Sequence, residues 1–358
     1  MSYPALPKPS AAIRNSTPIE YFESPEALLE KASHERFAVV FCDGKVYSLW
    51  KSLIDALCRE TPVITIAGGE ESKTLPSLRR LWKKLWQYKV DKGQKVLVIG
   101  GGSTLDVSGF AAATWKRGVP FVSVPTSLIA QIDAAFGGKV GINFRQGKNL
   151  LGTYAHPESI WILPAFLTTL DERSLKAGWV EGYKHALLEG GELWEEIQAT
   201  SFSALPSTLI LQKLVSVKLR YVQEDPYEEK GIRQALNLGH TLGHIWESLS
   251  QREEKPLLHG EAVAMGLVQE AFVSVQMGLL PEKVWETILS KLKGEKVLSP
   301  LPSFTWKQWE KLLSQDKKIR EGRVFIPLLL EVGRVALQAI PVERLKKVVR
   351  MYPSWLHA

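Results

Sequence analysis

Four polar side chains recur at helical spacing between residues 233 and 244. Arg233, Asn237, His240 and His244 stand at positions i, i+4, i+7 and i+11, which places them on one face of a predicted helix. A buried helix face normally carries Leu, Ile or Ala, and burying a guanidinium, an amide and two imidazoles is costly unless polar partners lie opposite. The stripe therefore predicts the lining of a binding or catalytic site.

Histidine and glutamate also occur in a pattern that could hold a metal ion. His240 and His244 lie one helical turn apart, His259 follows a loop, and Glu181 lies on another predicted helix. Three protein ligands and one open position are typical of catalytic zinc. His-x-x-x-His also arises in cores and helix caps, so the residues alone leave both interpretations open. One histidine could serve as an acid or base instead of a ligand.

Glycine-rich turns mark candidate anion sites in the first half of the chain. The run from Gly100 to Thr104 joins a predicted strand to a predicted helix, where glycines let an anion approach the helix N–H groups. A tight turn without a ligand gives the same pattern. Glu70 and Lys73 follow another strand, and an acid at that place could hold a ribose hydroxyl or cap a turn.

Further basic residues lie in two other segments. Lys139 and Lys148 adjoin glycines within residues 138–152, which predicts either an anion clamp or a solvated basic loop. Glu181 and Lys184 share a face of a later predicted helix, and this pattern fits a site pair or a surface salt bridge.

The elements that must position these residues change character along the chain. Up to about residue 165, short β-branched runs alternate with amphipathic helices, which predicts a parallel sheet with helices on both faces. Beyond that point helices dominate, including one predicted from Gly231 to Leu249, and a late hairpin is predicted near residues 324–337. We therefore expect an α/β domain over residues 1–165 and a mainly α-helical domain over residues 166–358.

Composition narrows the classes of protein. The 358 residues carry a net charge of +7 without a long Lys/Arg block, so an anionic metabolite is a better expected partner than nucleic acid. No apolar run reaches the roughly 18 residues of a membrane span. Residues 1–18 lack the order of a secretory signal and are expected to form a loose arm. Cys42 and Cys58 cannot form a disulfide framework and suit a reducing cytoplasm.

Together the motifs resemble the 3-dehydroquinate synthase family, within the sugar phosphate cyclases. They run in family order over roughly residues 37–330. The matching segments are Glu70-x-x-Lys73, Gly100-Gly-Gly-x-x-x-Asp106, Arg117-Gly118, Pro125-Thr-Ser, Asp133 to Lys139, Lys148-Asn149, Glu181-x-x-Lys184, Arg233 to His244, His259-Gly-Glu261 and Asp316-Lys317-Lys318. The resemblance implies a Rossmann-like NAD-binding domain followed by a mainly helical domain that binds metal and substrate.

The resemblance also implies residue roles. Glu181, His240 and His259 would bind a divalent metal, with zinc expected first and cobalt second. NAD would be held by Asp43, Glu70, Lys73, Gly101, Gly102, Ser103, Asp106, Thr126, Ser127 and Lys148. Substrate would be bound by Asp133, Lys139, Asn149, Lys184, Lys218, Arg233, Asn237, one of Lys317 and Lys318, and Arg117 from the neighbouring subunit of a homodimer. The catalytic residues would be His244 as proton relay, Lys184, Asn237, Arg233, Lys139 and Glu261.

The implied reaction converts 3-deoxy-D-arabino-heptulosonate 7-phosphate to 3-dehydroquinate and phosphate, a step of the shikimate pathway toward aromatic amino acids. NAD would be used transiently, phosphate would leave by β-elimination, and re-reduction and intramolecular aldol closure would follow. A sibling sugar phosphate cyclase and a metal-dependent alcohol or glycerol dehydrogenase are the alternatives. A carboxylate-bearing substrate is favoured by Lys218, Arg233, Asn237 and the Asp316-Lys317-Lys318 element, and a dehydrogenase would consume NAD stoichiometrically.

Overall fold

The computed structural model of the chain describes residues 17–145, 147–315 and 319–352. The described residues divide into two compact units. The N-terminal unit comprises residues 17–171 with 205–215, and the C-terminal unit comprises residues 172–204 with the described residues from 216 onward. Lys317 and Lys318, both predicted to face substrate, lie outside the described residues.

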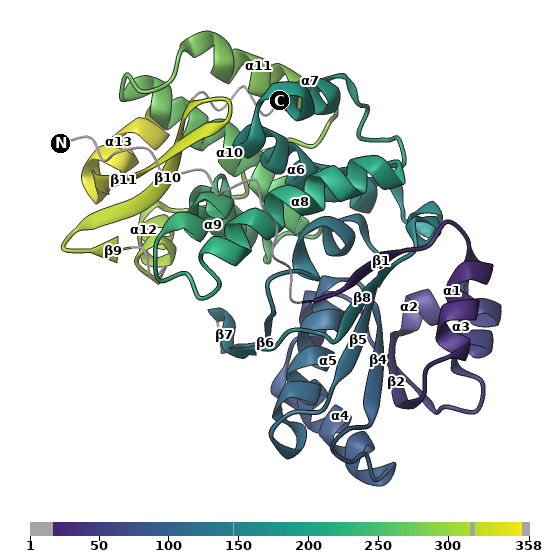
Figure 1. Ribbon diagram of the computed structural model, residues 1–358. Helices are drawn as coiled ribbons and strands as arrows, with labels where there is room; N and C mark the ends of the chain where they lie inside the picture. Colours follow the sequence, from purple (N-terminus) through teal and green to yellow (C-terminus); the bar gives the residue numbers. More distant parts are fainter. Residues whose placement is uncertain (1–16, 146, 316–318, 353–358) are drawn as a thin grey trace. The chain divides into compact units, whose positions relative to one another are not determined.

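A six-stranded parallel sheet forms the centre of the N-terminal unit (Figure 1). Its order is β1-β8-β5-β4-β2-β3, and every neighbouring pair runs parallel. The strands are β1 (Ile19–Tyr21), β2 (Phe37–Asp43), β3 (Val63–Ile66), β4 (Lys95–Gly100), β5 (Phe121–Pro125) and β8 (Ser159–Ile162). The three central strands β5, β4 and β2 are buried along most of their length, as expected for a sheet covered on both faces.

Helices cover the two faces of this sheet. The helices are α1 (Pro25–Ser33), α2 (Gly44–Leu49), α3 (Lys51–Cys58), α4 (Leu75–Gln87) and α5 (Gly102–Thr114). Figure 1 shows α1 and α3 on one face and α4 and α5 on the other. Leu28 of α1 and Ile54 of α3 belong to one hydrophobic core cluster with Val40 and Leu97 of the sheet, so α1 and α3 bury the same side of β2 and β4. Short turns η1 (Glu70–Ser72), η2 (Trp115–Arg117), η3 (Ala130–Ala134) and η4 (Pro164–Thr169) complete the connections.

A hairpin extends from the N-terminal unit where the sequence is rich in glycine. Strands β6 (Lys139–Phe144) and β7 (Gly147–Tyr154) pair antiparallel, and β6 packs on α5. Four large apolar side chains of the hairpin, Phe144, Leu150, Leu151 and Tyr154, are exposed. The glycine-rich stretch that carries Lys139 and Lys148 therefore forms a β-hairpin.

The C-terminal unit is built mainly of helices. These are α6 (Glu172–Glu189), α7 (Gly191–Ala199), α8 (Thr208–Glu224, whose first half clusters with the N-terminal unit), α9 (His240–Ser250), α10 (His259–Gln276), α11 (Glu282–Gly294), α12 (Trp306–Gln315) and α13 (Val342–Met351). Strands β9 (Ile319–Arg320), β10 (Arg323–Glu331) and β11 (Arg334–Pro341) form a small antiparallel sheet. Helix α10 is buried on nearly all sides because α6, α9, α11, α13 and β10 pack around it (Figure 1).

The predicted helix from Gly231 to Leu249 is wrong in its first half. Residues Ile232–Asn237 form a 3-10 turn, η5, and α9 begins only at His240 because Gly239 adopts a φ of +79°. A Cβ at Gly239 would also lie 2.7 Å from Leu267 Cγ, so both the left-handed turn and the packing require glycine. Arg233 and Asn237 therefore precede the helix that carries His240 and His244.

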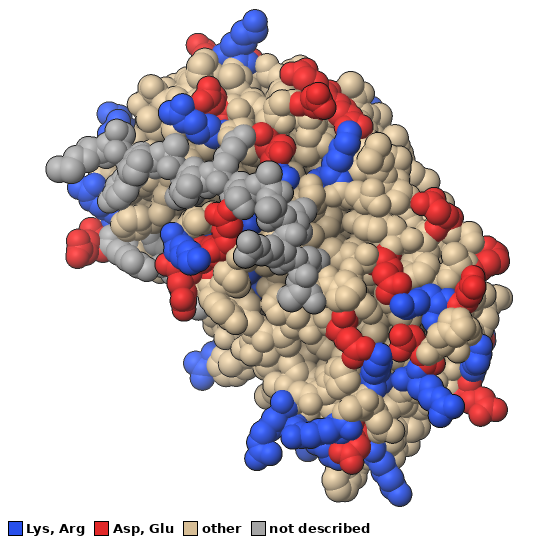
Figure 2. Space-filling model, viewed as in Figure 1, with Lys and Arg blue, Asp and Glu red and all other residues tan. Residues whose placement is uncertain are grey.

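The fold class predicted from the sequence is confirmed, with a parallel α/β unit first and a mainly helical unit after it. Among the described residues, no helix combines the length and the apolar character that crossing a membrane requires. Figure 2 shows acidic and basic side chains interspersed over one face, with basic side chains gathered at its lower end. Helix α4 exposes Arg79, Arg80 and Lys83, so part of the basic charge lies on this single helix.

Candidate functional site

A buried cluster of metal-ligand side chains lies in the C-terminal unit. Glu181 comes from α6, and His240 and His259 are the first residues of α9 and α10. The Nε2 atom of each histidine lies 3.5 Å from Glu181 Oε1. One ligand atom from each of the three residues lies within 4.8 Å of the others, and a carboxylate with two imidazoles is a donor set that zinc and cobalt accept. The residues present therefore fit one divalent cation.

Backbone contacts between helices bring these three ligands to one place. A Cβ at Gly266 of α10 would lie 1.8 Å from the carbonyl oxygen of Gly239, and one at Gly260 would lie 1.9 Å from that of Ala177 on α6. Only glycine allows such an approach. Gly260 therefore brings the start of α10 against α6 one turn before Glu181, and Gly266 brings the residue that precedes α9 against α10.

The electrostatic surroundings of His240 keep its imidazole neutral. Burial and the nearby Lys184 ammonium hold the pKa of His240 well below its usual range. Its Nδ1 lies 3.1 Å from the carbonyl oxygen of Leu238, which assigns the proton to that nitrogen and leaves the Nε2 lone pair toward Glu181. Lys184 itself forms an ion pair with Glu181 one turn away on α6, and both side chains are almost fully buried.

His259 has the opposite electrostatics. Burial alone would lower the pKa of His259, but the carboxylates of Glu247 and Glu181 raise it to about 10. Glu247 Oε1 lies 3.5 Å from His259 Nδ1, on the other side of the ring from Glu181. Glu247 was not among the residues predicted from the sequence, although its place seven residues after His240 puts it on the same face of α9.

His244 and Glu261 lie beside the cluster in different ways. The His244 ring is exposed, and its centroid is 5.3 Å from that of His240 and 5.8 Å from that of His259. The Glu261 carboxylate accepts a 2.8 Å hydrogen bond from Leu258 N–H and pairs with Arg173 through Nε and Nη2, both at 2.6 Å. These contacts fix the start of α10, and a catalytic role for Glu261 stays a prediction.

Arg233 is anchored to the loop that precedes it. Its Nη1 donates a 2.6 Å hydrogen bond to Pro226 O, and its backbone N–H donates to Asp225 Oδ2 at 3.2 Å. Burial would raise the pKa of Asp225, yet backbone N–H donors from Lys230, Arg233 and Glu229 lower it. Asn237 is half-buried at the end of η5, and Lys218 is buried on α8. All of these predicted substrate residues lie in the C-terminal unit with the metal-ligand cluster.

The predicted NAD-binding residues gather in the N-terminal unit at the carboxyl ends of neighbouring strands. Asp43 ends β2, the glycine turn follows β4, and Thr126 and Ser127 follow β5. Thr126 N–H donates a 3.0 Å hydrogen bond to Gly100 O. Ser127 packs close to the glycine turn, since a Cβ added at Gly101 would lie 3.4 Å from Ser127 Oγ. Ligands of open parallel sheets bind at this edge.

The start of α5 is suited to an anion. Among the described side chains none caps it, so the N–H groups of its first turn, Gly102 onward, face outward from the end of β4. Asp43 instead caps the neighbouring α2, with Oδ1 accepting from Lys45 N–H at 2.8 Å and Val46 N–H at 3.2 Å. The same carboxylate lies 3.4 Å from Thr104 Oγ1 through Oδ2.

A polar network links η1, α5 and the hairpin. Lys73 Nζ lies 2.7 Å from Asp106 Oδ2 and donates to Asn149 Oδ1, while Glu70 Oε1 accepts from Asn143 Nδ2 at 2.8 Å. Burial raises the pKa of Asp106 to about 6, and Lys73 opposes that rise. Asn149, predicted to bind substrate, thus lies among the predicted NAD residues, and the network also includes Asn143, which was not predicted from the sequence.

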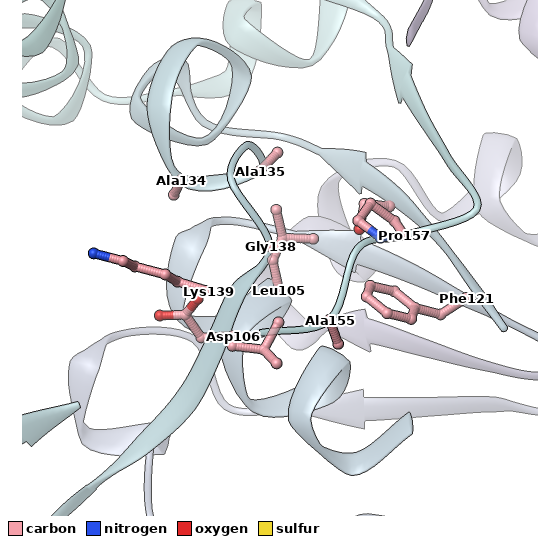
Figure 3. Close-up of a pocket in the computed structure, with 11 residues that line it drawn as sticks. Leu105, Asp106, Phe121, Ala134, Ala135, Gly138, Lys139, Ala155 and Pro157 are labelled. Carbon is pink, nitrogen blue, oxygen red and sulfur yellow. The ribbon is translucent and has the colours of Figure 1, made fainter. Parts of the chain in front are cut away.

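The remaining predicted residues lie around this network or at the surface. Ser103 Oγ is 3.4 Å from Glu70 Oε2. Lys139 helps to line a small pocket with Asp106, Phe121 and Gly138, and Figure 3 shows its side chain extending outward on the side of the Asp106 carboxylate. Asp133 on η3 and Lys148 on β7 are half-buried, whereas Arg117 is exposed with a φ of +68°.

The parallel sheet with an open glycine turn and the buried Glu–His–His cluster define a metal-dependent enzyme that contains a Rossmann-like unit. The chain belongs to the 3-dehydroquinate synthase family. The N-terminal domain of that family matches residues 63–177, and its C-terminal domain matches residues 178–319.

Known relatives agree with this family. The chain is 34% identical over 324 residues to a 3-dehydroquinate synthase of Streptococcus sanguinis (strain SK36), which covers 87% of this chain and 89% of the relative. Two solved structures are each 26% identical with TM-scores of 0.80. One is a 2-epi-5-epi-valiolone synthase from Streptomyces hygroscopicus subsp. jinggangensis 5008 with NAD+ and Zn2+, covering 96% of this chain and 98% of that one. The other is a 2-deoxy-scyllo-inosose synthase complexed with carbaglucose-6-phosphate, NAD+ and Co2+. The match covers 93% of this chain and 96% of that one.

Proposed function

We propose that this chain converts 3-deoxy-D-arabino-heptulosonate 7-phosphate to 3-dehydroquinate and phosphate, which makes it a carbon–oxygen lyase of the shikimate pathway. The buried cluster of Glu181, His240 and His259 beside Lys184 carries the proposal, because it lies within the family match over residues 178–319. Curated relatives at 31–36% identity, all 3-dehydroquinate synthases, support the same reaction.

The metal is assigned to Glu181, His240 and His259, with Zn2+ as the first candidate and Co2+ as the second. A divalent cation bound by these residues would supply a Lewis acid that lowers the pKa of a substrate hydroxyl. Lys184 balances the charge of Glu181 from within the protein, and the exposed His244 imidazole lies near enough to both ligand histidines to pass a proton to or from solvent.

The NAD site is assigned to the carboxyl ends of β2, β4 and β5. The open N-terminus of α5 would take the pyrophosphate, and the network around Glu70, Lys73 and Asp106 would hold the ribose hydroxyls. Bound NAD would supply a hydride acceptor that is restored within the same turnover, so the cofactor is a catalyst in this reaction.

The substrate is an anion with a carboxylate at one end and a phosphate at the other. Lys218, Arg233 and Asn237 provide two cations and an amide in the C-terminal unit, which suits the carboxylate and hydroxyls. Asp133, Lys139 and Asn149 complete the proposed substrate set in the N-terminal unit, while Lys317 and Lys318 fall outside the described residues. A cation near the departing phosphate would stabilise its developing charge.

One assay tests this function and its alternatives. The purified chain is incubated with the heptulosonate phosphate, substoichiometric NAD and Zn2+, and inorganic phosphate and NADH are followed together. Phosphate release without net NADH supports the proposal. Net NADH from a simple alcohol or glycerol would identify a dehydrogenase, and phosphate release only from a hexose or heptose phosphate without a carboxylate would identify a sibling cyclase.

We also propose that the chain acts as a homodimer in which Arg117 serves the partner's site. The exposed arginine and the exposed apolar side chains of the β6–β7 hairpin support an interface on this unit. Mixing Arg117→Ala with His240→Ala provides the test. Subunit exchange between the two impaired variants restores activity if Arg117 acts in trans, and restores none if it acts in cis.

A cytoplasmic location is proposed from the thiol chemistry. Cys42 and Cys58 are both buried free cysteines, a state suited to a reducing compartment. Fractionation of cells that express the tagged chain tests this assignment.

A further inference from the structure

Glu247 occupies a specific place relative to His259. Its Oε1 lies 3.5 Å from His259 Nδ1, while the Nε2 of the same ring lies 3.5 Å from Glu181 Oε1. The two nitrogens of an imidazole point in nearly opposite directions, so the two carboxylates flank the ring on opposite sides. An atom bound to Nε2 therefore cannot also contact Glu247.

We propose that Glu247 is a positioning residue that accepts a hydrogen bond from His259 Nδ1–H and so presents the Nε2 lone pair to the metal. This role rests on the metal centre assigned under the proposed function. A neutral histidine that donates electrons through Nε2 carries its proton on Nδ1, and that proton needs an acceptor if the ring is to keep one orientation. A carboxylate acceptor also makes the imidazole a stronger ligand.

The setting of Glu247 fits this role. Its side chain is only 8% exposed, whereas that of His259 is 35% exposed, so the carboxylate is the more firmly enclosed member of the pair. Glu247 lies two turns after His240 on α9, hence one rigid helix carries one ligand and the partner of another. His240 has a different acceptor, the carbonyl oxygen of Leu238 at 3.1 Å from Nδ1. Each ligand histidine is thus oriented by its own acceptor, one neutral and one charged.

A competing arrangement would make Glu247 a metal ligand itself. His244, Glu247 and His259 also offer one atom each within 4.8 Å of one another. A neutral imidazole, however, has one ring nitrogen with a free lone pair. His259 can therefore bind a cation beside Glu181 through Nε2, or a cation beside Glu247 through Nδ1, but not both. The burial of Glu181 and His240 favours the first position, since His244 is exposed.

Metal binding without substrate tests the proposal. Zn2+ affinity is measured by competition with a chromophoric chelator, metal content is counted per chain, and the visible absorption of the Co2+ form reports ligand geometry. Glu247→Ala is expected to weaken Zn2+ and Co2+ binding about 10- to 100-fold and to alter the Co2+ spectrum. Glu247→Gln keeps an acceptor oxygen without the charge, so it is expected to lose less affinity than Glu247→Ala and to retain the parent spectrum.

Trp246→Phe provides a matched control on the same helix. It removes the 2.6 Å hydrogen bond from Trp246 Nε1 to Gln269 and should lower the melting temperature while leaving metal affinity unchanged. The proposal is overturned if Glu247→Ala keeps the parent's metal affinity and Co2+ spectrum. It is also overturned if the parent binds two metal ions per chain and Glu247→Ala binds only one, because Glu247 would then be a ligand. A parent chain that binds neither ion overturns the metal centre as well. If Glu247→Ala does not fold, Glu247→Gln provides the test. Its metal affinity should be measurably lower than that of the parent because the charge of the acceptor is lost, and an unchanged affinity overturns the proposal.

Discussion

The Glu270 carboxylate on α10 accepts a 2.6 Å hydrogen bond from the backbone N–H of Gly239, immediately before α9 begins. Its other oxygen accepts from Leu242 N–H at 3.0 Å, and the residue is fully buried. Helix α10 thus caps the N-terminus of the preceding helix, α9, with a negative charge, where the helix dipole favours it. His240, the first residue of α9, is fixed by this contact between helices.

Removing this cap should destabilise the C-terminal unit. Glu270→Ala leaves buried N–H donors without their acceptor, and we expect the free energy of unfolding to fall by about 3 kcal/mol or more. Glu270→Gln keeps one acceptor and should lose less. Urea unfolding followed by circular dichroism measures both. A loss below about 1 kcal/mol for Glu270→Ala would show that water or another acceptor replaces the carboxylate.

The Glu181–Lys184 pair predicts a metal-dependent mutational effect. Lys184→Met leaves the Glu181 carboxylate buried without its ammonium partner, which should cost about 3 kcal/mol in the metal-free chain. Excess Zn2+ should narrow that deficit, because the cation supplies the missing positive charge and binds only the folded chain. Thermal melts of parent and variant with chelator or with Zn2+ give the comparison. An equal deficit under both conditions contradicts the metal assignment of Glu181.

The two histidines of α9 should respond differently to truncation. His240→Ala is expected to abolish stoichiometric Zn2+ binding, since its Nε2 faces Glu181. His244→Ala should keep the metal and slow turnover about 10²- to 10⁴-fold, the range for a lost acid or base. Metal content and kcat are measured on the same preparations. Loss of metal in His244→Ala would reverse the roles given to the pair.

Asp106 predicts a pH dependence of stability in the N-terminal unit. Burial raises its pKa to about 6 in the folded chain, above the value of about 3.9 in an unfolded one. Such an acid stabilises the fold below its unfolded pKa, and that contribution is lost as pH rises through 6. Relative to Asp106→Asn, the parent should lose about 1–3 kcal/mol between pH 4 and pH 7. Urea unfolding without NAD tests this, and parallel pH curves for the two proteins would refute it.

The sequence predicted the fold class well because its signals are local. Short β-branched runs mark β2, β4 and β5, and apolar residues at helical spacing mark the helices that dominate the second half of the chain. The break at Gly239 escaped prediction because the polar stripe from Arg233 to His244 continues through it at helical spacing. A left-handed glycine held against Leu267 of another helix is a tertiary feature, and no local pattern announces it.

Candidate site residues could be predicted from the sequence where a polar or ionisable residue stands at a helix position that normally carries an apolar one. Histidines and a glutamate in predicted helices marked Glu181, His240, His244 and His259 as candidate ligands, and the family resemblance narrowed the predicted set to Glu181, His240 and His259. Glu247 and Glu270 act through partners that are distant in the chain or on another helix, and each looks like an ordinary helical glutamate in the sequence. Asn143 was likewise hidden in a hairpin strand, where its contact with Glu70 spans 73 residues of sequence.

The backbone contacts at Gly260 and Gly266 limit which substitutions the surroundings of the candidate metal ligands can accept. Backbone contacts at Gly266 and Gly260 set the distance of α10, which carries His259, from the start of α9 and from α6, which carry His240 and Glu181. No rotamer can adjust to absorb a larger residue there, so any substituent at these two glycines would move a ligand rather than repack a core. Substitutions at positions 181, 240 and 259 can change the donor atoms, but the spacing of the three helices that carry them is set by the backbone.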